Sequence, residues 1–236
     1  MDSISQDVKV QEYERKVSYQ KYQIDLTKVY YQKIIAAVRR FSQNDNEKLL
    51  DVACWDGTLA AEFLPTREVY GLEGNAEACQ LANTRGIKAK KVDLEKGLPF
   101  PDAMFDTVIA AEIIEHLYDT DFFLQEIYRI LQKGGLLVMS IPNIACFTNR
   151  IAMLFGKYPR YGEYRAGGAG HIRVYTAPVI KKQLQDHAFH VVYYAGCNLP
   201  LPMHHRFIPK WLKIFAIRVG EYFPTISGQT ILAAYK

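Results

Sequence analysis

Two histidines in this sequence stand where a side chain could take up a proton. His116 lies in the segment AAEIIEHL, and His171 follows a group of glycines, Gly167, Gly168 and Gly170. A neutral imidazole near pH 7 can accept a proton from a hydroxyl group as that oxygen reacts. We interpret His116 as the first candidate for a general base and His171 as the second. The alternatives are that His116 orients a ligand and that His171 holds the neighbouring segment in place.

Acidic residues occur within or at the end of three successive apolar segments. Asp51 lies in LLDVA, Glu73 ends EVYGLE and Asp93 ends KKVD. In open α/β sheets a nucleotide-like ligand lies beyond the carboxyl ends of the strands, and a carboxylate about 20 residues after the first turn binds the ribose hydroxyls. Glu73 has this spacing and is the strongest candidate for a ribose ligand.

Aromatic and basic residues form a third group of candidates. The sequence has 16 Tyr and 12 Phe, and tyrosines are crowded into residues 13–31 and 158–175. Aromatic rings beside guanidinium groups suit a ligand that carries a ring or an anionic substituent. The predicted pocket contains Tyr158, Tyr161, Tyr164, Arg165 and Arg173. The alternative is that the aromatic residues belong to the core.

The elements that must position these residues follow an alternating pattern. From Lys48 onward, short apolar runs alternate with helical patterns, which predicts βαβ units and a parallel sheet. The predicted strands are LLDVA, EVYGLE, IKAKKVD, FDTVIAA, LLVMSIP, FHVVYYAG and QTILAAYK. The predicted helices are an Ala-rich one ending at Phe63, 76–85, 121–131 and one starting near Thr176. Gly134 and Gly135 are expected to end the helix 121–131.

The chain is expected to form one main domain, 47–236, after an N-terminal helical segment, 1–46. Apolar residues at roughly helical spacing over 11–41 indicate one or two helices before the core. Residues 144–170 interrupt the alternation and are predicted to be a lid-like insertion. A second interruption, 197–227, contains an apolar helical stretch that is expected to pack on its own domain. The alternative for this stretch is contact with a membrane surface.

Composition excludes several classes of protein. The chain is 49% hydrophobic and 23% charged, as expected of a globular protein. The net charge of +4 is spread thinly, and no run of Lys and Arg exceeds a pair, so no nucleic-acid partner is expected. No stretch approaches the ~20 apolar residues of a membrane span. Four separated cysteines without a CxxC pair predict neither a zinc site nor disulfides and favour a cytoplasmic location, with the periphery of the inner membrane as the alternative.

Six segments in a fixed order resemble the motifs of one family. They are LLDVACWDG, EVYGLE, KKVDLE, LPFPDAMFDTVIAAEIIEHL, LQKGGLLVMSIPN and HIRVYT. Together they resemble the class I S-adenosylmethionine-dependent methyltransferases, over roughly residues 47–192. The chain looks most like bacterial small-molecule methyltransferases, a branch with quinone-precursor, methionine-pathway and polysaccharide-cluster members. The resemblance implies a Rossmann-like, doubly wound α/β fold whose seven-stranded sheet is mostly parallel, with an antiparallel last strand, 229–235.

The resemblance also implies a cofactor and its binding residues. The cofactor would be S-adenosyl-L-methionine, the product S-adenosyl-L-homocysteine, and no metal is expected. The implied cofactor-binding residues are Asp51, Ala53, Cys54, Trp55, Gly57, Glu73, Gly74, Asp93, Leu94, Ala111 and Glu112. Asp93 would bind the adenine amino group with Leu94 flanking the ring, and Ala111 and Glu112 would lie at the methionine end.

On the acceptor side the resemblance implies that Asn143, in SIPN, orients the substrate beside Tyr161, Tyr164, Arg165 and Arg173. Turn formation is the alternative for Asn143.

The first turn departs from the family at two positions. The family has glycines at alternate positions there, because bare backbone lets a ligand approach closely. Gly57 is present, but Ala53 and Trp55 occupy the other two glycine positions. Either the Trp55 side chain points away while its backbone keeps the turn, or it caps the pocket.

These observations predict a methyltransferase that acts on a small molecule, with a hydroxyl of a saccharide or quinone-like ring as the acceptor. Catalysis would then consist largely of placing donor and acceptor atoms about 3–3.5 Å apart. Ala53 and Trp55 motivate one alternative, a catalytically degenerate partner protein with the same fold. The stretch 207–223 motivates another, a peripheral-membrane enzyme with a lipid-linked acceptor. The sequence leaves the oligomeric state open.

Overall fold

A single mixed sheet organises the described part of the chain. The computed structural model describes residues 24–43, 47–162, 170–201 and 208–236. Within them seven strands are arranged in the order β3-β2-β1-β4-β5-β7-β6. Their bounds are β1 Lys48–Val52, β2 Glu68–Glu73, β3 Lys88–Lys91, β4 Phe105–Ala111, β5 Leu131–Pro142, β6 His190–Gly196 and β7 Gln229–Tyr235. Only β7 is antiparallel to its neighbours, β5 and β6. The predicted fold and the antiparallel last strand are confirmed.

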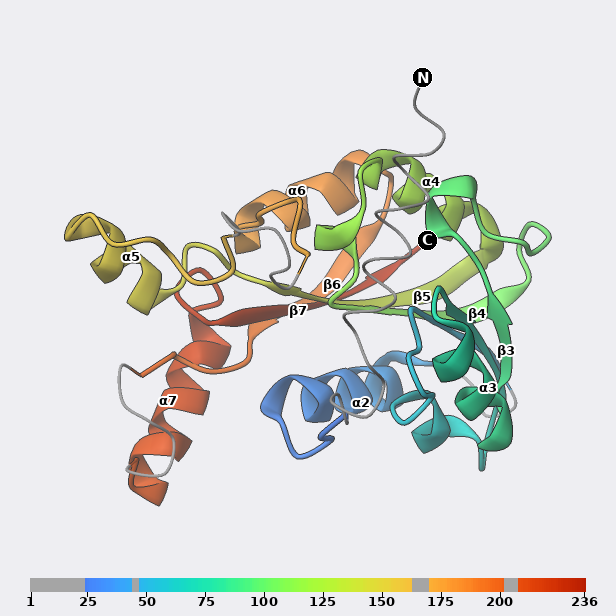
Figure 1. Cartoon of the computed structure of the whole chain (residues 1–236), viewed down its shortest axis with the longest axis horizontal. Helices are drawn as coiled ribbons and strands as arrows, with labels where there is room; N and C mark the ends of the chain where they lie inside the picture. Colours follow the sequence, from blue (N-terminus) through green and yellow to red (C-terminus); the bar gives the residue numbers. More distant parts are fainter. Residues whose placement is uncertain (1–23, 44–46, 163–169, 202–207) are drawn as a thin grey trace.

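Helices cover both faces of this sheet (Figure 1). The helices α2, Val29–Phe41, and α3, Ala76–Thr84, lie on one face, and α4, Thr120–Ile130, and α6, Ala177–Asp186, lie on the other. The arrangement follows from alternation along the strands, because successive side chains point to opposite faces. In β5, for example, Leu137 and Met139 join the core under α4 and α6, whereas Leu136 and Val138 join the core under α2.

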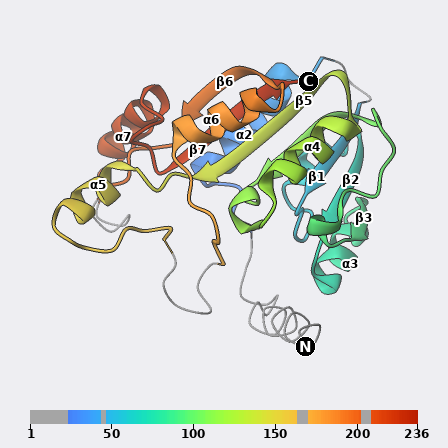
Figure 2. The same ribbon diagram turned by 90° about the horizontal axis from the view of Figure 1, so that it is seen from above.

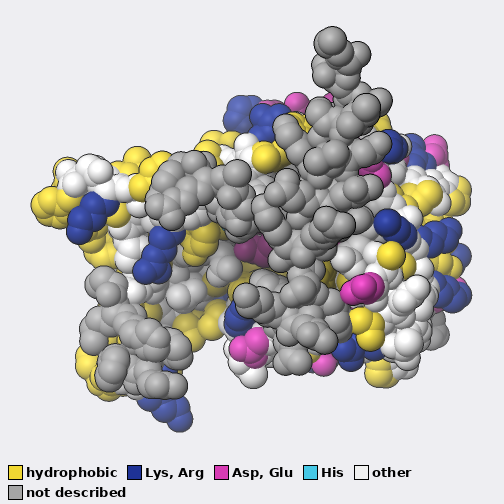
Figure 3. All heavy atoms as spheres, viewed as in Figure 1, with side chains coloured by type: hydrophobic (Ala, Val, Ile, Leu, Met, Phe, Trp, Pro, Cys, Tyr) yellow, Lys and Arg dark blue, Asp and Glu magenta, His cyan; other side chains and the backbone are white. Residues whose placement is uncertain are grey.

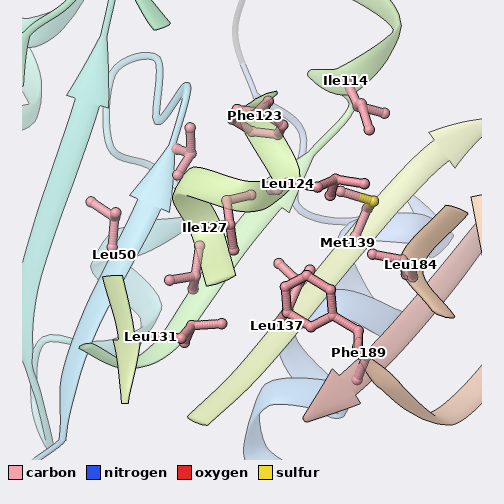
Figure 4. Close-up of a cluster of buried hydrophobic side chains, with 14 of the residues drawn as sticks. Leu50, Ile114, Phe123, Leu124, Ile127, Leu131, Leu137, Met139, Leu184 and Phe189 are labelled. Atoms are coloured by element: carbon pink, nitrogen blue, oxygen red, sulfur yellow. The ribbon is translucent and has the colours of Figure 1, made fainter. Parts of the chain in front are cut away.

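The core under α4 is built from one face of that helix. Phe123, Leu124 and Ile127 point from α4 toward Leu50 of β1 and Leu137 of β5 (Figure 4). All five side chains are at most 1% exposed. Full burial of a Leu, Ile or Phe side chain stabilises a fold by about 1.5–3 kcal/mol. This packing fixes α4, and with it the loop that joins β4 to α4.

Side-chain caps fix where two helices begin at the carboxyl edge of the sheet. Asn75 accepts a hydrogen bond from the backbone N–H of Ala78 at 2.9 Å at the start of α3, and Asp119 accepts one from Phe122 at 2.9 Å at the start of α4. Such caps contribute about 1 kcal/mol each. They hold the loops after β2 and β4 in defined positions.

The first crossover differs from the expected Ala-rich helix ending at Phe63. Only a short 3-10 helix, Ala60–Phe63, connects β1 to β2. Pro65 follows it closely and has no backbone N–H with which to continue a helical ladder. The left-handed turn takes up the chain as far as Gly57, so few residues remain before Pro65 in which a full α-helix could form.

The role expected of Gly134 and Gly135 is also wrong. The helix α4 ends at Ile130, before the two glycines, and both lie inside β5. The pairing of β4 with β5 shifts register here, and Gly134 has a φ of 76°. A Cβ on Gly135 would lie 2.9 Å from the carbonyl oxygen of Gln132. The glycine pair therefore forms a bulge in a strand instead of a helix C-cap.

Two further helices project together from one end of the sheet (Figures 1 and 2). The predicted insertion contains α5, Phe147–Leu154, and the second interruption contains α7, Lys210–Tyr222. The loop after α7 anchors the start of α5, because Phe147 N donates to Ile226 O at 2.9 Å. Among the described residues, no helix combines the length and the apolar character that crossing a membrane requires.

Candidate functional site

The candidate site lies where the strand order reverses. β1 and β4 are neighbours, yet the chain leaves β1 toward β2 and β3 on one side and leaves β4 toward β5 on the other. Ligands of open α/β sheets bind in the crevice beyond the carboxyl ends of the strands at this point. In this protein the turn after β1, the end of β2 and the loop after β4 lie at this point.

The turn after β1 keeps the backbone of a glycine turn without its glycines. Ala53, Trp55 and Gly57 have φ angles of 61°, 51° and 76°, so all three are left-handed. For residues with a side chain, a left-handed conformation costs about 1–2 kcal/mol. Such strain persists only where surrounding contacts enforce it, and it is concentrated at functional sites. The backbone at Trp55 therefore keeps the left-handed turn.

Glu73 is the contact that holds this turn. Its Oε2 accepts a hydrogen bond from the backbone N–H of Trp55 at 2.9 Å, and its Oε1 accepts one from Asn75 at 2.8 Å. Cys54, which precedes Trp55 and is buried, donates its N–H to Leu72 O of β2 at 3.0 Å. The two bonds to the carboxylate of Glu73 are charge-assisted, and such bonds are stronger than neutral ones. One carboxylate thus joins the turn after β1 to the start of α3.

Gly57 is required for packing. A Cβ at this position would lie 2.7 Å from Ile87 Cδ1 and 3.1 Å from the Cβ of Ala82 in α3. Arg85, the C-cap residue of α3, donates to the carboxylate of Asp56 at 2.9 Å. The glycine therefore lets the turn lie directly against α3, where a side chain would push the two apart.

Buried carboxyl groups give this side of the site its electrostatic character. Asp51 is 2% exposed and Glu73 is 8% exposed. Burial, with a smaller contribution from the charge of Glu73, raises the pKa of Asp51 to about 8. Burial also raises the pKa of Glu73, although its backbone hydrogen bonds oppose the shift. A cationic ligand would favour the ionised form of both groups.

The residues expected around an adenine ring lie at the rim of the site. Asp93 caps the 3-10 helix Leu94–Lys96: its Oδ1 accepts from Glu95 N at 3.1 Å, and its Oδ2 pairs with Lys96 at 3.1 Å. Its side chain is 52% exposed. Leu94 is half-buried beside the core, and Gly74 is exposed. Val92 N donates to Glu73 O at 2.9 Å, which keeps Asp93 close to the end of β2.

The loop after β4 brings a second strained residue into the site. Ala111 ends the strand, and Glu112 follows with a φ of 51°. The Glu112 N–H donates to Ser140 O at 3.0 Å, and its Oε2 accepts from Gln229 Nε2 at 3.4 Å. Among the described residues its buried Oε1 has no hydrogen-bond partner. Burial raises the pKa of Glu112.

The two candidate bases meet in space, together with a glutamate. Nε2 of His116 lies 3.9 Å from Glu115 Oε1, and Nε2 of His171 lies 4.0 Å from the same oxygen. The imidazole centroids are 4.9 Å apart. Backbone bonds hold the two segments together, because Ile172 N and Arg173 N both donate to Glu115 O at 3.0 Å. We refer to Glu115, His116 and His171 as the histidine–glutamate cluster.

Glu115 is the site residue that the sequence reasoning did not select. It is 1% exposed, and burial together with the charge of Glu112 raises its pKa. Its signal in the sequence is a second glutamate, three residues after Glu112 and directly before His116, in a loop that follows a buried strand. Only the fold shows that this carboxylate points to His171 as well.

The predicted acceptor-side residues are divided by the structure. Asn143 is fully buried; its Nδ2 donates to Ser227 O at 2.9 Å and its Oδ1 accepts from Ala145 N at 3.0 Å. These contacts correspond to the alternative role, turn formation. Tyr161 lies next to the cluster through its carbonyl oxygen, which accepts from His171 Nδ1 at 3.2 Å. Arg173 is exposed and donates to Tyr118 O.

Two of the predicted acceptor-side residues, Tyr164 and Arg165, lie outside the described residues, and Tyr158 is 55% exposed on the projecting insertion.

Comparison with known proteins identifies the central part of the chain. Residues 50–139 match the family model described as a methyltransferase domain. A probable S-adenosylmethionine-dependent methyltransferase of Mycolicibacterium smegmatis is 33% identical over 42% of this chain and 40% of its own length. The ubiquinone biosynthesis O-methyltransferase of Pelagibacter ubique is 28% identical over 48% of this chain and 49% of its own length. The chain thus spans less than half the length of each of these relatives.

Solved structures share the whole fold at low identity. The structure of a SAM-dependent methyltransferase from Thermotoga maritima, titled a possible histamine N-methyltransferase, superposes with a TM-score of 0.65 and 18% identity. The match covers 87% of this chain and 89% of that one. At this level of identity the likeness concerns the fold alone.

The raised pKa of Asp51 predicts how stability depends on pH in the absence of ligand. Above about pH 4 the unfolded chain has released this proton, whereas the folded protein keeps it until its own, higher pKa. The free energy of unfolding should therefore fall as the pH rises from 6 to 8. In Asp51→Asn the fall should be shallower, by at most about 1.4 kcal/mol per pH unit. Urea unfolding at several pH values measures both slopes.

A matched control is Asp186→Asn, which removes an exposed carboxylate paired with Lys182. This variant should keep the wild-type slope. Identical slopes for wild type and Asp51→Asn would show that Asp51 is not a buried, protonated group.

Proposed function

Because this chain belongs to the class I S-adenosylmethionine-dependent methyltransferases, we propose that it transfers a methyl group from S-adenosylmethionine to a hydroxyl group of a small molecule. The observation that carries this proposal is the left-handed turn at Ala53, Trp55 and Gly57, which Glu73 holds at the switch point of the sheet. The turn keeps the backbone shape of the family's glycine turn despite its side chains. This favours a working cofactor site over a degenerate one.

The charges around the crevice suit this cofactor. S-adenosylmethionine carries a sulfonium and an ammonium group, and the crevice presents Asp51, Glu73 and Glu112, all with pKa values raised by burial. Binding a cation there would offset the cost of burying carboxylates. In this proposal Glu73 binds the ribose, Asp93 and Leu94 border the adenine, and Ala111 and Glu112 lie beside the methionine end. Its free lone pairs allow Glu73 to accept ribose hydroxyls while it holds the turn.

The methyl transfer itself is an in-line displacement. The acceptor oxygen forms a bond to the methyl carbon, the carbon–sulfur bond breaks, and the electron pair of that bond turns the sulfonium into the thioether of S-adenosylhomocysteine. A hydroxyl acceptor must also lose its proton. Nδ1 of His116 lies 3.1 Å from Gly170 O and donates to it, which leaves the lone pair on Nε2. His116 can take the proton there, and His171 is placed to assist it.

The acceptor is proposed to be a ring or saccharide hydroxyl. Two considerations favour a hydroxyl over a carbon or nitrogen acceptor: the histidine–glutamate cluster offers proton acceptors, and one relative is named a ubiquinone biosynthesis O-methyltransferase. Tyr161 and Arg173 adjoin the cluster and would contact the ring and an anionic substituent.

A second candidate function, methylation of a lipid-linked acceptor at a membrane surface, is favoured by α7. This helix packs inward with small residues, since Ala216 and Gly220 are buried and Leu199 N donates to Ala216 O at 2.8 Å. Its large residues face outward: Trp211 is 69% exposed and Phe215 56%. One face of this stretch therefore packs on its own domain, whereas Trp211 and Phe215 do not.

The neighbouring helix has the same character. On α5 and just after it, Ile151, Met153, Leu154 and Phe155 are exposed. Arg150 Nη2 donates to Thr225 O, in the loop after α7, at 2.9 Å, which ties the two helices to one base. Figure 3 shows hydrophobic side chains gathered on this projecting end beside Lys and Arg. Apolar helices with basic neighbours bind anionic membrane surfaces.

Cofactor binding can be tested with Glu73→Ala. Loss of its charge-assisted hydrogen bonds should weaken S-adenosylmethionine binding about 10- to 100-fold. Isothermal titration calorimetry with the cofactor and its demethylated product measures this. Glu68→Ala, at the opposite end of the same strand, should bind as the wild type does. Failure of the wild type to bind at millimolar concentration would make this a methyltransferase fold without the activity.

Proton transfer can be tested with His116→Ala. Turnover of a hydroxyl acceptor should fall about 10²- to 10⁴-fold, while cofactor affinity stays unchanged. Radiolabelled methyl transfer to a panel of phenolic and saccharide acceptors provides the rate. His187→Ala, which removes a histidine paired with Asp121 on the surface, serves as the control. Full turnover by His116→Ala would exclude it from the reaction.

Membrane docking can be tested by flotation with anionic liposomes. The wild type should float with the vesicles, and Trp211→Glu, Phe215→Glu should remain in the soluble fraction, because two exposed anchors become acidic. Val179→Glu, Val192→Glu places the same added charge at exposed positions of α6 and β6 and should still float. Equal flotation of both variants would remove the membrane candidate.

A further inference from the structure

We propose that the histidine–glutamate cluster binds a divalent metal ion, which holds the acceptor hydroxyl beside the transferable methyl group. The role of the ion rests on the proposed function, whereas its binding stands on the geometry of Glu115, His116 and His171 alone. The fold itself needs no metal, and the family resemblance led to the expectation of none. The three side chains nevertheless converge from two segments far apart in the sequence.

The distances in the cluster fit coordination better than direct hydrogen bonding. One oxygen of Glu115 lies 3.9 Å from Nε2 of His116 and 4.0 Å from Nε2 of His171, and all three ligand atoms lie within 4.8 Å of one another. These separations exceed a hydrogen bond. Two ligand atoms that each lie about 2.1 Å from one ion are roughly 3–4 Å apart in tetrahedral or octahedral geometry. A small inward movement completes such a site.

Both imidazoles are set in the tautomer that a ligand requires. Nδ1 of His116 lies 3.1 Å from Gly170 O, and Nδ1 of His171 lies 3.2 Å from Tyr161 O. A carbonyl oxygen can only accept, so Nδ1 carries the hydrogen in each ring and the Nε2 lone pair faces Glu115. Histidines that bind metals almost always donate their other N–H to such a backbone or carboxylate oxygen.

Glu115 supplies the independent observation that points to a cation. Its side chain is 1% exposed, and among the described residues neither of its carboxylate oxygens has a hydrogen-bond partner. A buried carboxylate without a partner costs several kcal/mol. The nearby Glu112 adds a second buried oxygen without a described partner and adds negative charge. A divalent cation at the cluster would offset the cost of burying these oxygens of Glu115 and Glu112.

The ligand set indicates which ions fit. Two imidazole nitrogens and a carboxylate suit Zn²⁺, Mn²⁺, Fe²⁺ or Co²⁺, and three protein ligands leave coordination positions open. An acceptor hydroxyl bound at an open position has a lowered pKa, so it loses its proton before methyl transfer. In this state His116 acts as a ligand, and the proton passes to solvent instead of to its Nε2.

The proposal can be tested by titrating untagged, chelator-treated protein with Co²⁺ or Zn²⁺ in the absence of S-adenosylmethionine. One ion should bind per chain by calorimetry, and Co²⁺ should give a visible ligand-field absorption band. Glu115→Gln and His171→Ala should each weaken binding at least about 10-fold. Circular dichroism and cofactor titration check that both variants remain folded.

Two controls remove histidines outside the cluster. His187→Ala, and the double variant His204→Ala, His205→Ala, which removes the adjacent pair in the sequence, should keep the affinity and the Co²⁺ band. Two results would overturn the metal site. One is wild-type metal binding weaker than millimolar. The other is a double variant that loses metal binding while Glu115→Gln and His171→Ala keep it. Because no cofactor or acceptor is present, this failure is distinct from failure of methyl transfer. Transfer by metal-free protein would likewise overturn the metal's role and leave the methyltransferase proposal standing.

Discussion

The hydrogen bond from Trp55 N–H to the carboxylate of Glu73 is the contact on which the candidate site depends. It spans the two neighbouring strands β1 and β2 and fixes a turn whose residues would otherwise leave the left-handed region. Because the same carboxylate also accepts from Asn75, it links the turn to the start of α3. Two of the left-handed residues in this turn, Ala53 and Trp55, carry side chains, and the Glu73 carboxylate holds the backbone of the second.

Burial of acids at one edge of the sheet is the second organising constraint. Asp51 of β1, Glu73 of β2 and the pair Glu112 and Glu115 in the loop after β4 lie there, and burial raises the pKa of each. Such a site costs free energy in the absence of a ligand. It gains most from positive charge, which a sulfonium cofactor and a divalent ion would both supply. The same electrostatics thus link the cofactor side of the crevice to the acceptor side.

The acceptor side is held together by backbone contacts more than by side chains. Ile172 and Arg173 both donate to Glu115 O, and Asn143 pairs with Tyr175 in an isolated bridge. The segment 170–175 is therefore fixed between the loop after β4 and the end of β5. The projecting helices α5 and α7 adjoin this region through the buried amide of Asn143, which donates to Pro224, Thr225 and Ser227. Both helices therefore share one base with the end of β5.

The sequence by itself determined most of the alternating strands and helices and the doubly wound sheet, because apolar periodicity is a local pattern. It also identified His116 and His171 as separate candidates. Only the tertiary structure decided that these two rings meet across Glu115, that Asn143 forms a turn, and that Gly134 and Gly135 form a bulge. The physical reason is that these outcomes depend on contacts between residues distant in sequence. The left-handed turn at Trp55 is the clearest case, since its local sequence disfavours a conformation that Glu73 enforces from the next strand.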